Sequence, residues 1–168
     1  MTTPFEQLSS EFWNTADQYI GTKELDAIPM TRGEYNMIRG WAMPADENPD
    51  DGGYIVRYQD GYVSWSPEYQ FDSAYVPNGK LSFSHALHKM KDGARVARAG
   101  WNGNYMFIFW VDGSEFEVNR APLNKCYPEG TKIKYHSHID MKTADGQVVP
   151  WTCSQTDMAA NDWCVVDV

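Results

Sequence analysis

The chain has 168 residues, and 42% of them are hydrophobic and 14% aromatic, which is enough to bury the core of one domain or of two small ones. The formal net charge of −9 argues against nonspecific binding of DNA or RNA, and no apolar run is long enough to cross a membrane. We therefore expect a cytoplasmic protein that has neither a nucleic acid nor a membrane as its partner. Three cysteines without a closely spaced pair favour reduced thiols over a disulfide framework or a zinc site.

The acidic charge is confined to the first half of the chain. Residues 1–79 contain 4 Lys or Arg and 13 Asp or Glu, whereas residues 80–168 contain 10 basic and 10 acidic residues. The turn-forming residues 77–79 come just before a new helical pattern. We therefore predict an acidic α+β module of unknown role over residues 1–78 and a second module, able to accept a small anion, over residues 80–168.

The first module shows helical and hairpin patterns. Apolar residues spaced three and four apart predict an amphipathic helix at its start, and Thr31 and Glu34 have the spacing of a capping box for a second helix. An acidic loop with Pro and Gly follows over residues 44–53. The expected elements are a helix over residues 5–19, a short helix after Thr31, and a hairpin of residues 54–58 and 62–66 followed by a helical turn toward Phe71.

The second module has the frequent turns of an antiparallel sheet. Apolar spacing predicts a first helix, which Gly93 would close as its C-terminal cap, and alternating segments between turns predict a series of strands. The expected fold is α+β, with a small antiparallel β-sheet and a packed helix. The expected elements are a helix over residues 82–91 and strands over residues 95–99, 105–111, 115–119, 131–139, 148–152 and 163–166.

Residues 137–157, SHIDMKTADGQVVPWTCSQTD, contain more hydrogen-bonding side chains than a core requires. Asp145 and Gly146 predict a tight type I′ turn between two strands, which places these polar residues at a rim. Ser154 has the residue type and position of an N-cap for a short helix, whose free N–H groups would face the rim. Such N–H groups beside Trp151 suit a ligand that has both a phosphate group and a flat ring.

Four long segments of the second module match a known family. They are FSHALHKMKDGARVARAGWNG, MFIFWVDGSEFEVNR, YPEGTKI and, above all, HIDMKTADGQVVPWTCSQTDMAANDW. Through these segments the chain resembles the second Thoeris anti-defence family of phage proteins over about residues 81–166. Several long motifs in the same order are more specific than one short pattern. The first module resembles a segment of unknown role in other phage proteins, which supports a phage origin but no activity.

The resemblance implies a small homo-oligomer, expected to be a tetramer, in the cytoplasm of the infected bacterial host. Such a protein captures a cyclic ADP-ribose isomer, glycocyclic ADP-ribose, that a bacterial TIR-domain enzyme makes. Capture blocks Thoeris immunity without degrading the signal. Some members of the family also bind cyclic dinucleotides at a separate site, and this stays open for the present chain. The resemblance implies no cofactor.

The chemistry of such a ligand assigns roles to several residues of the second module. Adenine stacks on aromatic faces, a pyrophosphate binds cations and N–H or O–H donors, and ribose hydroxyls bind carboxylates and amides. We expect Trp101 or Trp151 to stack on adenine, and Arg120 to be the first phosphate contact. The neutral phosphate donors would be Ser154, Gln155 and Thr156, and the hydroxyl or base-edge contacts would come from Asn102, Asn119 and Asp140 or Asp157.

These residues also have purely structural interpretations. Trp101 could fold back onto the core as a hydrophobic plug, and Arg120 could pair with a nearby glutamate at the surface. Asp140 could cap the hairpin, whereas Ser154 and Asp157 could cap the helix without any ligand. Capping and ligand binding are compatible with each other.

No recognisable catalytic or metal motif accompanies these residues. The sequence has no nucleophile elbow, phosphate loop, deaminase set or standard zinc pattern, which favours a binding protein over an enzyme. Two alternatives stay open, namely a hydrolase that cleaves the same messenger and an interaction scaffold that acts through the acidic first module. Phe107, Phe109 and Trp110 exceed what one small sheet would bury, which indicates that another subunit covers one face.

Overall fold

The computed structural model describes residues 17–18 and 21–166, so the helix expected over residues 5–19 lies almost entirely outside the described residues. Contacts between residues divide the chain into two compact units, and the division falls between Phe71 and Asp72. Described helices and antiparallel sheets occur in both units, which confirms the α+β fold. Among the described helices, none is long and apolar enough to cross a membrane.

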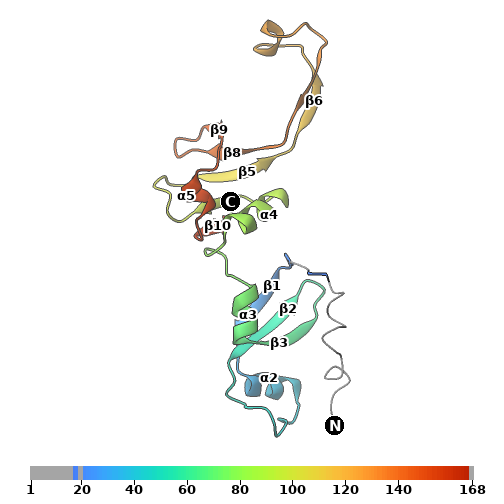
Figure 1. The fold of residues 1–168 in the computed structure, drawn as a ribbon, viewed down its shortest axis with the longest axis vertical. Coiled ribbons are helices and arrows are strands. Elements are labelled where there is room, and N and C mark those ends of the chain that lie inside the picture. Colours follow the sequence, from blue (N-terminus) through green and yellow to red (C-terminus); the bar gives the residue numbers. More distant parts are fainter. Residues whose placement is uncertain (1–16, 19–20, 167–168) are drawn as a thin grey trace. The chain divides into compact units, whose positions relative to one another are not determined.

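The described part of the first unit forms an antiparallel sheet in the order β1-β2-β3 (Figure 1). The predicted capping box is present, because Thr31 Oγ1 accepts from Glu34 N and Glu34 Oε2 accepts from Thr31 N. Strand β1 was not predicted from the sequence. Its LDAIP segment does not alternate between apolar and polar residues, and it ends in a proline, which is found mainly in edge strands. The elements are β1 (Leu25–Pro29), α2 (Arg32–Arg39), β2 (Gly53–Tyr58), β3 (Val63–Pro67) and α3 (Glu68–Ala74).

Gly53 at the start of β2 lies directly against β3. A Cβ at this position would overlap the carbonyl oxygen of Ser66 and the indole of Trp65. The indole cannot move freely, because its Nε1 donates to Met30 O at 2.9 Å and the guanidinium of Arg32 lies 5.1 Å from the ring centroid. The position therefore requires glycine for reasons of space.

We expect Gly53→Ala to destabilise the first unit by roughly 2–3 kcal/mol, since overpacking at a fixed neighbour forces backbone shifts. Thermal unfolding followed by circular dichroism would measure this loss. Gly21→Ala is the matched control, because a Cβ at Gly21 meets nothing within 4 Å. Equal melting curves for the two variants would contradict the packing at Gly53.

The second unit is built on a sheet with the order β10-β4-β5-β8-β9 among its described strands, and α4 packs against it (Figure 1). Leu81 N donates to Trp163 O at 3.0 Å and Trp163 N donates to Leu81 O at 3.1 Å, which joins the segment before α4 to β10. The elements are α4 (Phe83–Lys91), β4 (Val96–Arg98), β5 (Phe107–Val111), β6 (Ser114–Glu117), the 3-10 helix η2 (Leu123–Lys125), β7 (Lys132–Tyr135), β8 (His138–Lys142), β9 (Val148–Pro150), α5 (Gln155–Met158) and β10 (Trp163–Val165).

The hydrophobic core of this unit lies between α4 and one face of the sheet. Because side chains alternate along a strand, Ile108 and Trp110 of β5 pack on the core, and Phe107 and Phe109 lie on the opposite face. We call this opposite face the outer face. The buried core residues are Leu81, Ala86, Met90, Val96, Ile108 and Trp163.

The predicted hairpin between β8 and β9 is present, but the type I′ turn is wrong. A type I′ turn needs a positive φ at both central residues, and in this turn only Gly146 has one, at 87°. Gly146 N donates to Thr143 O at 3.0 Å, and the Asp145 carboxylate accepts from Thr143 Oγ1 and from Gln147 Nε2. The turn is therefore wider than the predicted two-residue connection.

The strand predicted over residues 131–139 is in fact two strands. After β7 the chain bends at residues 136–137 and enters the larger sheet as β8. Strands β6 and β7 form a two-stranded ribbon that extends β5 and β8, with the β6–β7 loop at its far end (Figure 1). We call the ribbon and its loop, residues 114–135, the arm. Its ladder pairs Phe116 with Ile133 and Ser114 with Tyr135 on one face, and Glu115 with Lys134 and Glu117 with Lys132 on the other.

Candidate ligand-binding site

Three tryptophans meet at the edge of the core of the second unit. Trp163 is fully buried, and the half-buried Trp101 and Trp151 pack against the same core. The ring centroids are 5.4 Å apart for Trp101 and Trp163, 6.2 Å for Trp151 and Trp163, and 6.4 Å for Trp101 and Trp151. Each pair meets edge to face, an arrangement that aromatic quadrupoles favour. Trp101 and Trp151 thus support the core and also keep part of their surface accessible.

Asp157 lies beside these rings with a side chain that is 14% exposed. Its Oδ1 accepts from Arg98 Nη1 at 2.8 Å and from Trp101 Nε1 at 3.1 Å. Its Oδ2 accepts from Ser154 Oγ at 2.7 Å, while Ser154 Oγ accepts from Asp157 N at 3.0 Å. Trp163 Nε1 donates to Asp157 O at 3.0 Å. These bonds tie α5 to the tryptophan cluster.

Arg98 connects Asp157 to a second carboxylate, that of Asp162. Arg98 Nε donates to Asp162 Oδ1 at 2.7 Å, and Gly100 N donates to Asp162 Oδ2 at 2.9 Å. The bond from Gly100 fixes the turn that leads from β4 to Trp101. The Arg98 side chain is only 14% exposed, so its charge depends on these partners for stabilisation.

The carboxyl groups of this network are ionised at neutral pH. Burial acts to raise the pKa of Asp157, but hydrogen bonds from Ser154, Arg98 and Trp101 outweigh burial and hold this pKa below its ordinary value. The hydrogen bond from Arg98 likewise lowers the pKa of Asp162. With two carboxylates and one guanidinium, the network offers hydrogen-bond acceptors rather than a proton. That chemistry suits the hydroxyl and amino groups of a nucleoside.

The structure brings together four of the predicted site residues, namely Trp101, Trp151, Ser154 and Asp157. The hydroxyl proton of Ser154 points to Asp157, so this side chain stabilises the start of α5 as its structural interpretation predicts. Asn102 follows Trp101 in an exposed turn, and Gln155 and Thr156 are exposed in α5. The ligand roles of all these residues stay predictions.

The other predicted site residues lie elsewhere in the second unit. Asp140 is on the outer face of β8, where His138 Nε2 lies 3.5 Å from its Oδ1, and this oxygen has no hydrogen-bond partner among the described residues. Asn119 and Arg120 are exposed in the loop that follows β6. Within one copy of the chain, the fold therefore separates these three residues from the tryptophan cluster.

Arg98 and Asp162 were not among the site residues predicted from the sequence. Arg98 had a detectable signal, because it lies two residues after Val96 and so shares the core-facing side of the same strand. A cation at such a position needs an acidic partner, which the sequence did not identify. Asp162 lies in a polar turn before β10 and carries no comparable signal.

Known proteins resemble the second unit. The family model of the Thoeris anti-defense 2-like domain matches residues 81–166, which include the sheet, the arm and the tryptophan cluster. The chain is also 36% identical over 90 residues to Thoeris anti-defense 2 of Bacillus phage SP01, and this alignment covers 52% of the chain and 96% of that protein. The chain belongs to the Thoeris anti-defense 2-like family.

Membership of the Thoeris anti-defense 2-like family confirms the resemblance predicted from the four sequence segments. It supports a role in phage anti-defence against Thoeris immunity. All predicted site residues, as well as Arg98 and Asp162, lie within the Thoeris anti-defense 2-like match. The first unit lies outside it, so its role is not explained by the family.

Proposed function

We propose that this protein binds and sequesters a cyclic ADP-ribose-type nucleotide, glycocyclic ADP-ribose, that a bacterial TIR-domain enzyme makes. The observation that carries the proposal is the family match over residues 81–166. Sequestration removes the messenger from solution and so blocks Thoeris immunity without a chemical step. The binding of cyclic dinucleotides at a separate site stays an open alternative.

The tryptophan cluster supports the binding of a nucleoside. Trp101 and Trp151 present accessible ring surface for adenine, and the ionised Asp157 accepts hydrogen bonds from hydroxyl or amino groups. Nanomolar capture needs about −12 kcal/mol, and stacking supplies only ~1–3 kcal/mol per base. Charge-assisted bonds to the pyrophosphate must provide much of the rest, and Arg120 stays our first candidate for this role, supplied by the arm of a second copy because it lies away from the cluster within one copy.

The pKa values of Cys153 and Asp157 favour binding of the ligand without its cleavage. Burial, followed by the charge of Asp157, raises the pKa of the Cys153 thiol, which makes it a poor nucleophile at neutral pH. The lowered pKa of Asp157 leaves no proton there for a leaving group and also makes this carboxylate a weak base. We therefore propose a binding protein rather than a hydrolase.

Calorimetric titration of the full chain with glycocyclic ADP-ribose tests this function. We expect saturable binding with a dissociation constant in the nanomolar range and recovery of chemically intact nucleotide after heat denaturation of the complex. Chromatography of the released nucleotide separates capture from turnover. Altered nucleotide would establish a hydrolase instead, and an absence of heat at micromolar protein would refute sequestration of this ligand.

The arm supports the predicted homo-oligomer. Phe116, Ile133 and Tyr135 form an apolar face on a two-stranded ribbon, and Phe116 and Tyr135 are 36% and 46% exposed. An isolated two-stranded ribbon is only marginally stable in water, so this face gains from cover by a second copy. We therefore propose that the apolar face of the arm contributes to the subunit contacts.

We expect Phe116→Gln to raise the dissociation constant of the oligomer several-fold, because full burial of a Phe side chain contributes about 1.5–3 kcal/mol and only the exposed 36% of Phe116 is left for a subunit contact to bury. Sedimentation equilibrium over a concentration series would measure this change. Lys134→Gln, on the charged face of the same ribbon, is the matched control and should leave the constant unchanged. The same mass at every concentration for both variants would exclude the arm from the interface.

A further inference from the structure

Two asparagines of the second unit are followed directly by glycine. They form the pairs Asn78-Gly79 and Asn102-Gly103, and both asparagine side chains are exposed. In such a pair the backbone nitrogen of the glycine can attack the side-chain amide, because a residue without a Cβ leaves the approach open and the backbone free to adopt the required angles. The hydrogen bonds of the two asparagines decide which of them can react.

The side chain of Asn78 is held by the backbone of β10. Its Nδ2 donates to Val165 O at 3.1 Å, and its Oδ1 accepts from Val165 N at 2.7 Å. Both bonds must break before Cγ of Asn78 can turn toward the nitrogen of Gly79. The native structure therefore protects Asn78 from this reaction.

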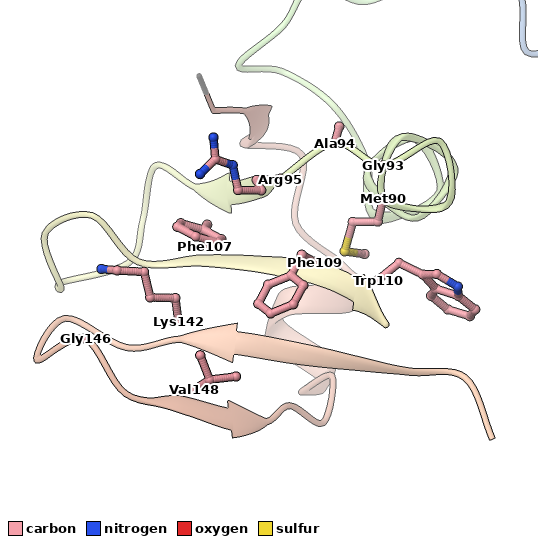
Figure 2. A pocket seen from close by; sticks show the side chains of 10 residues that line it. All are labelled: Met90, Gly93, Ala94, Arg95, Phe107, Phe109, Trp110, Lys142, Gly146 and Val148. Atoms are coloured by element: carbon pink, nitrogen blue, oxygen red, sulfur yellow. The ribbon is translucent and has the colours of Figure 1, made fainter. Parts of the chain in front are cut away.

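Asn102 lies in the connection between β4 and β5, which is fixed only at its ends. Gly100 N donates to Asp162 Oδ2 at 2.9 Å near β4, and Lys142 Nζ donates to Tyr105 O at 3.2 Å near β5. Figure 2 shows this connection reaching β5 beside Lys142. Between these two points, residues 102–104 form no hydrogen bond with any described residue. The side chain of Asn102 and the nitrogen of the next glycine are therefore free to meet.

The Asp-Gly pairs of the chain, which can react in the same way, are also held in place. The carboxylate of each contacts a hydrogen-bond donor or a basic group of another described residue, and a carboxylate carbon is attacked more slowly than an amide carbon. Among all these pairs, Asn102 is the one whose side chain has no such partner in the described part of the chain. The aspartates are Asp51, Asp60, Asp92, Asp112 and Asp145, and their partners are, in the same order, Asn48, Tyr62, His88, Trp110 and Thr143.

We propose that Asn102 deamidates spontaneously in the folded protein. The nitrogen of Gly103 gives its proton to hydroxide and attacks Cγ of Asn102, so that a new N–C bond closes a succinimide ring and the bond from Cγ to Nδ2 breaks. The leaving group takes a proton from water and departs as ammonia, which restores the hydroxide. A water molecule then opens the ring at either carbonyl and leaves aspartate or isoaspartate at position 102.

Either product places a negative charge in the residue after Trp101, whose ring belongs to the tryptophan cluster. A carboxylate at this point repels the pyrophosphate of a bound nucleotide. The affinity for the nucleotide should therefore fall as the protein ages. This consequence rests on the proposed function, whereas the modification itself does not.

Peptide mass spectrometry of the full chain, incubated in mildly alkaline buffer with and without guanidinium chloride, tests the modification. In the folded protein we expect Asn102 to deamidate about tenfold faster than Asn78, because two hydrogen bonds must break before Asn78 can react. In the denaturant the two rates should become similar, since unfolding removes those bonds. Asn104 is exposed in the same connection but precedes Tyr105, so it is the internal control and should stay intact in the folded protein.

Calorimetric titration with glycocyclic ADP-ribose tests the consequence for binding. Asn102→Asp reproduces one product of the reaction, and we expect its dissociation constant to be about fivefold higher than that of wild type, since one added charge close to a phosphate repels it even in water. Gln59→Glu, in an exposed turn of the first unit, adds the same charge elsewhere and should leave the constant unchanged.

The two measurements separate the modification from the function. Equal rates at Asn78 and Asn102 in the folded protein, or an intact Asn102, would overturn the proposed modification. A wild-type dissociation constant for Asn102→Asp would overturn its effect on capture. A wild-type protein that binds no nucleotide would refute the proposed function alone, because the mass measurement uses no ligand.

Discussion

Replacement of Arg98 by Met should destabilise the second unit by about 2–3 kcal/mol at neutral pH. The variant leaves Asp157 and Asp162 without the cation that both carboxylates contact at 2.7–2.8 Å. Loss of one partner of a fully buried ion pair costs about 3–5 kcal/mol, and we expect less here because the Asp162 side chain is 33% exposed. Urea denaturation followed by tryptophan fluorescence would measure the change, since the cluster reports directly on this region.

Arg95→Met is the matched control for Arg98→Met. It removes the same group three residues earlier, where no described carboxylate forms an ion pair with the side chain. We expect this control to lose less than 1 kcal/mol. Similar losses for the two variants would contradict the structural role of the Arg98 network.

The effect of Arg98→Met should also depend on pH. The folded-state pKa values of Asp157 and Asp162 are lowered, so the stability they contribute is fully present above their unfolded pKa of about 4. This contribution to stability is lost as the pH falls through the lowered folded-state pKa values of the two carboxyl groups. The difference between wild type and Arg98→Met should therefore shrink below about pH 4. An equal difference at pH 7 and pH 3 would show that the lost stability has another origin.

Trp151→Ala should weaken the binding of glycocyclic ADP-ribose at least tenfold, because the loss of one stacking face costs ~1–3 kcal/mol. The structure adds a cost in stability, since the Trp151 centroid lies 6.2 Å from that of Trp163 and 6.1 Å from that of Phe83. Removal of a partly buried Trp from such a cluster destabilises the unit by a few kcal/mol.

Trp110→Ala separates the two effects of Trp151→Ala. Trp110 is also half-buried and packs against the same core, but it belongs to β5 and donates its Nε1 to Asp112 at 3.0 Å. We expect a comparable loss of stability without the tenfold loss of affinity for the nucleotide. Calorimetry on folded protein measures the affinity, and urea denaturation measures the stability. A folded Trp151→Ala variant with the wild-type dissociation constant would remove Trp151 from the site.

Local signals predicted much of the secondary structure. The capping box at Thr31, the helix that starts after Ser82 and the β8–β9 hairpin depend on residues only a few positions apart, and each is present. The break between β7 and β8 has no local signal, because residues 131–139 read as one continuous strand. The backbone at the bend lies directly against a distant residue, since a Cβ at Gly113 would lie 2.6 Å from Tyr135 O.

The candidate site was only partly predictable for a similar reason. Aromatic and polar residue types identified Trp101, Trp151 and Asp157, but their proximity depends on how β4, β9 and α5 pack together. The network through Arg98 joins residues 59 and 64 positions apart. No periodicity in the sequence encodes such a pairing, which becomes visible only when the strands are placed.

The pair of hydrogen bonds between Leu81 and Trp163 brings the two ends of the family domain next to each other. A domain whose ends are neighbours can gain a preceding module without any change in the order of its strands. The acidic first unit is therefore an added module that precedes a complete family domain. Its replacement by another module during phage evolution would leave the tryptophan cluster intact. Because the domain ends are neighbours, a circular permutant should also fold. In it a short linker joins the two ends, and the new termini lie in the exposed turn at Gly146.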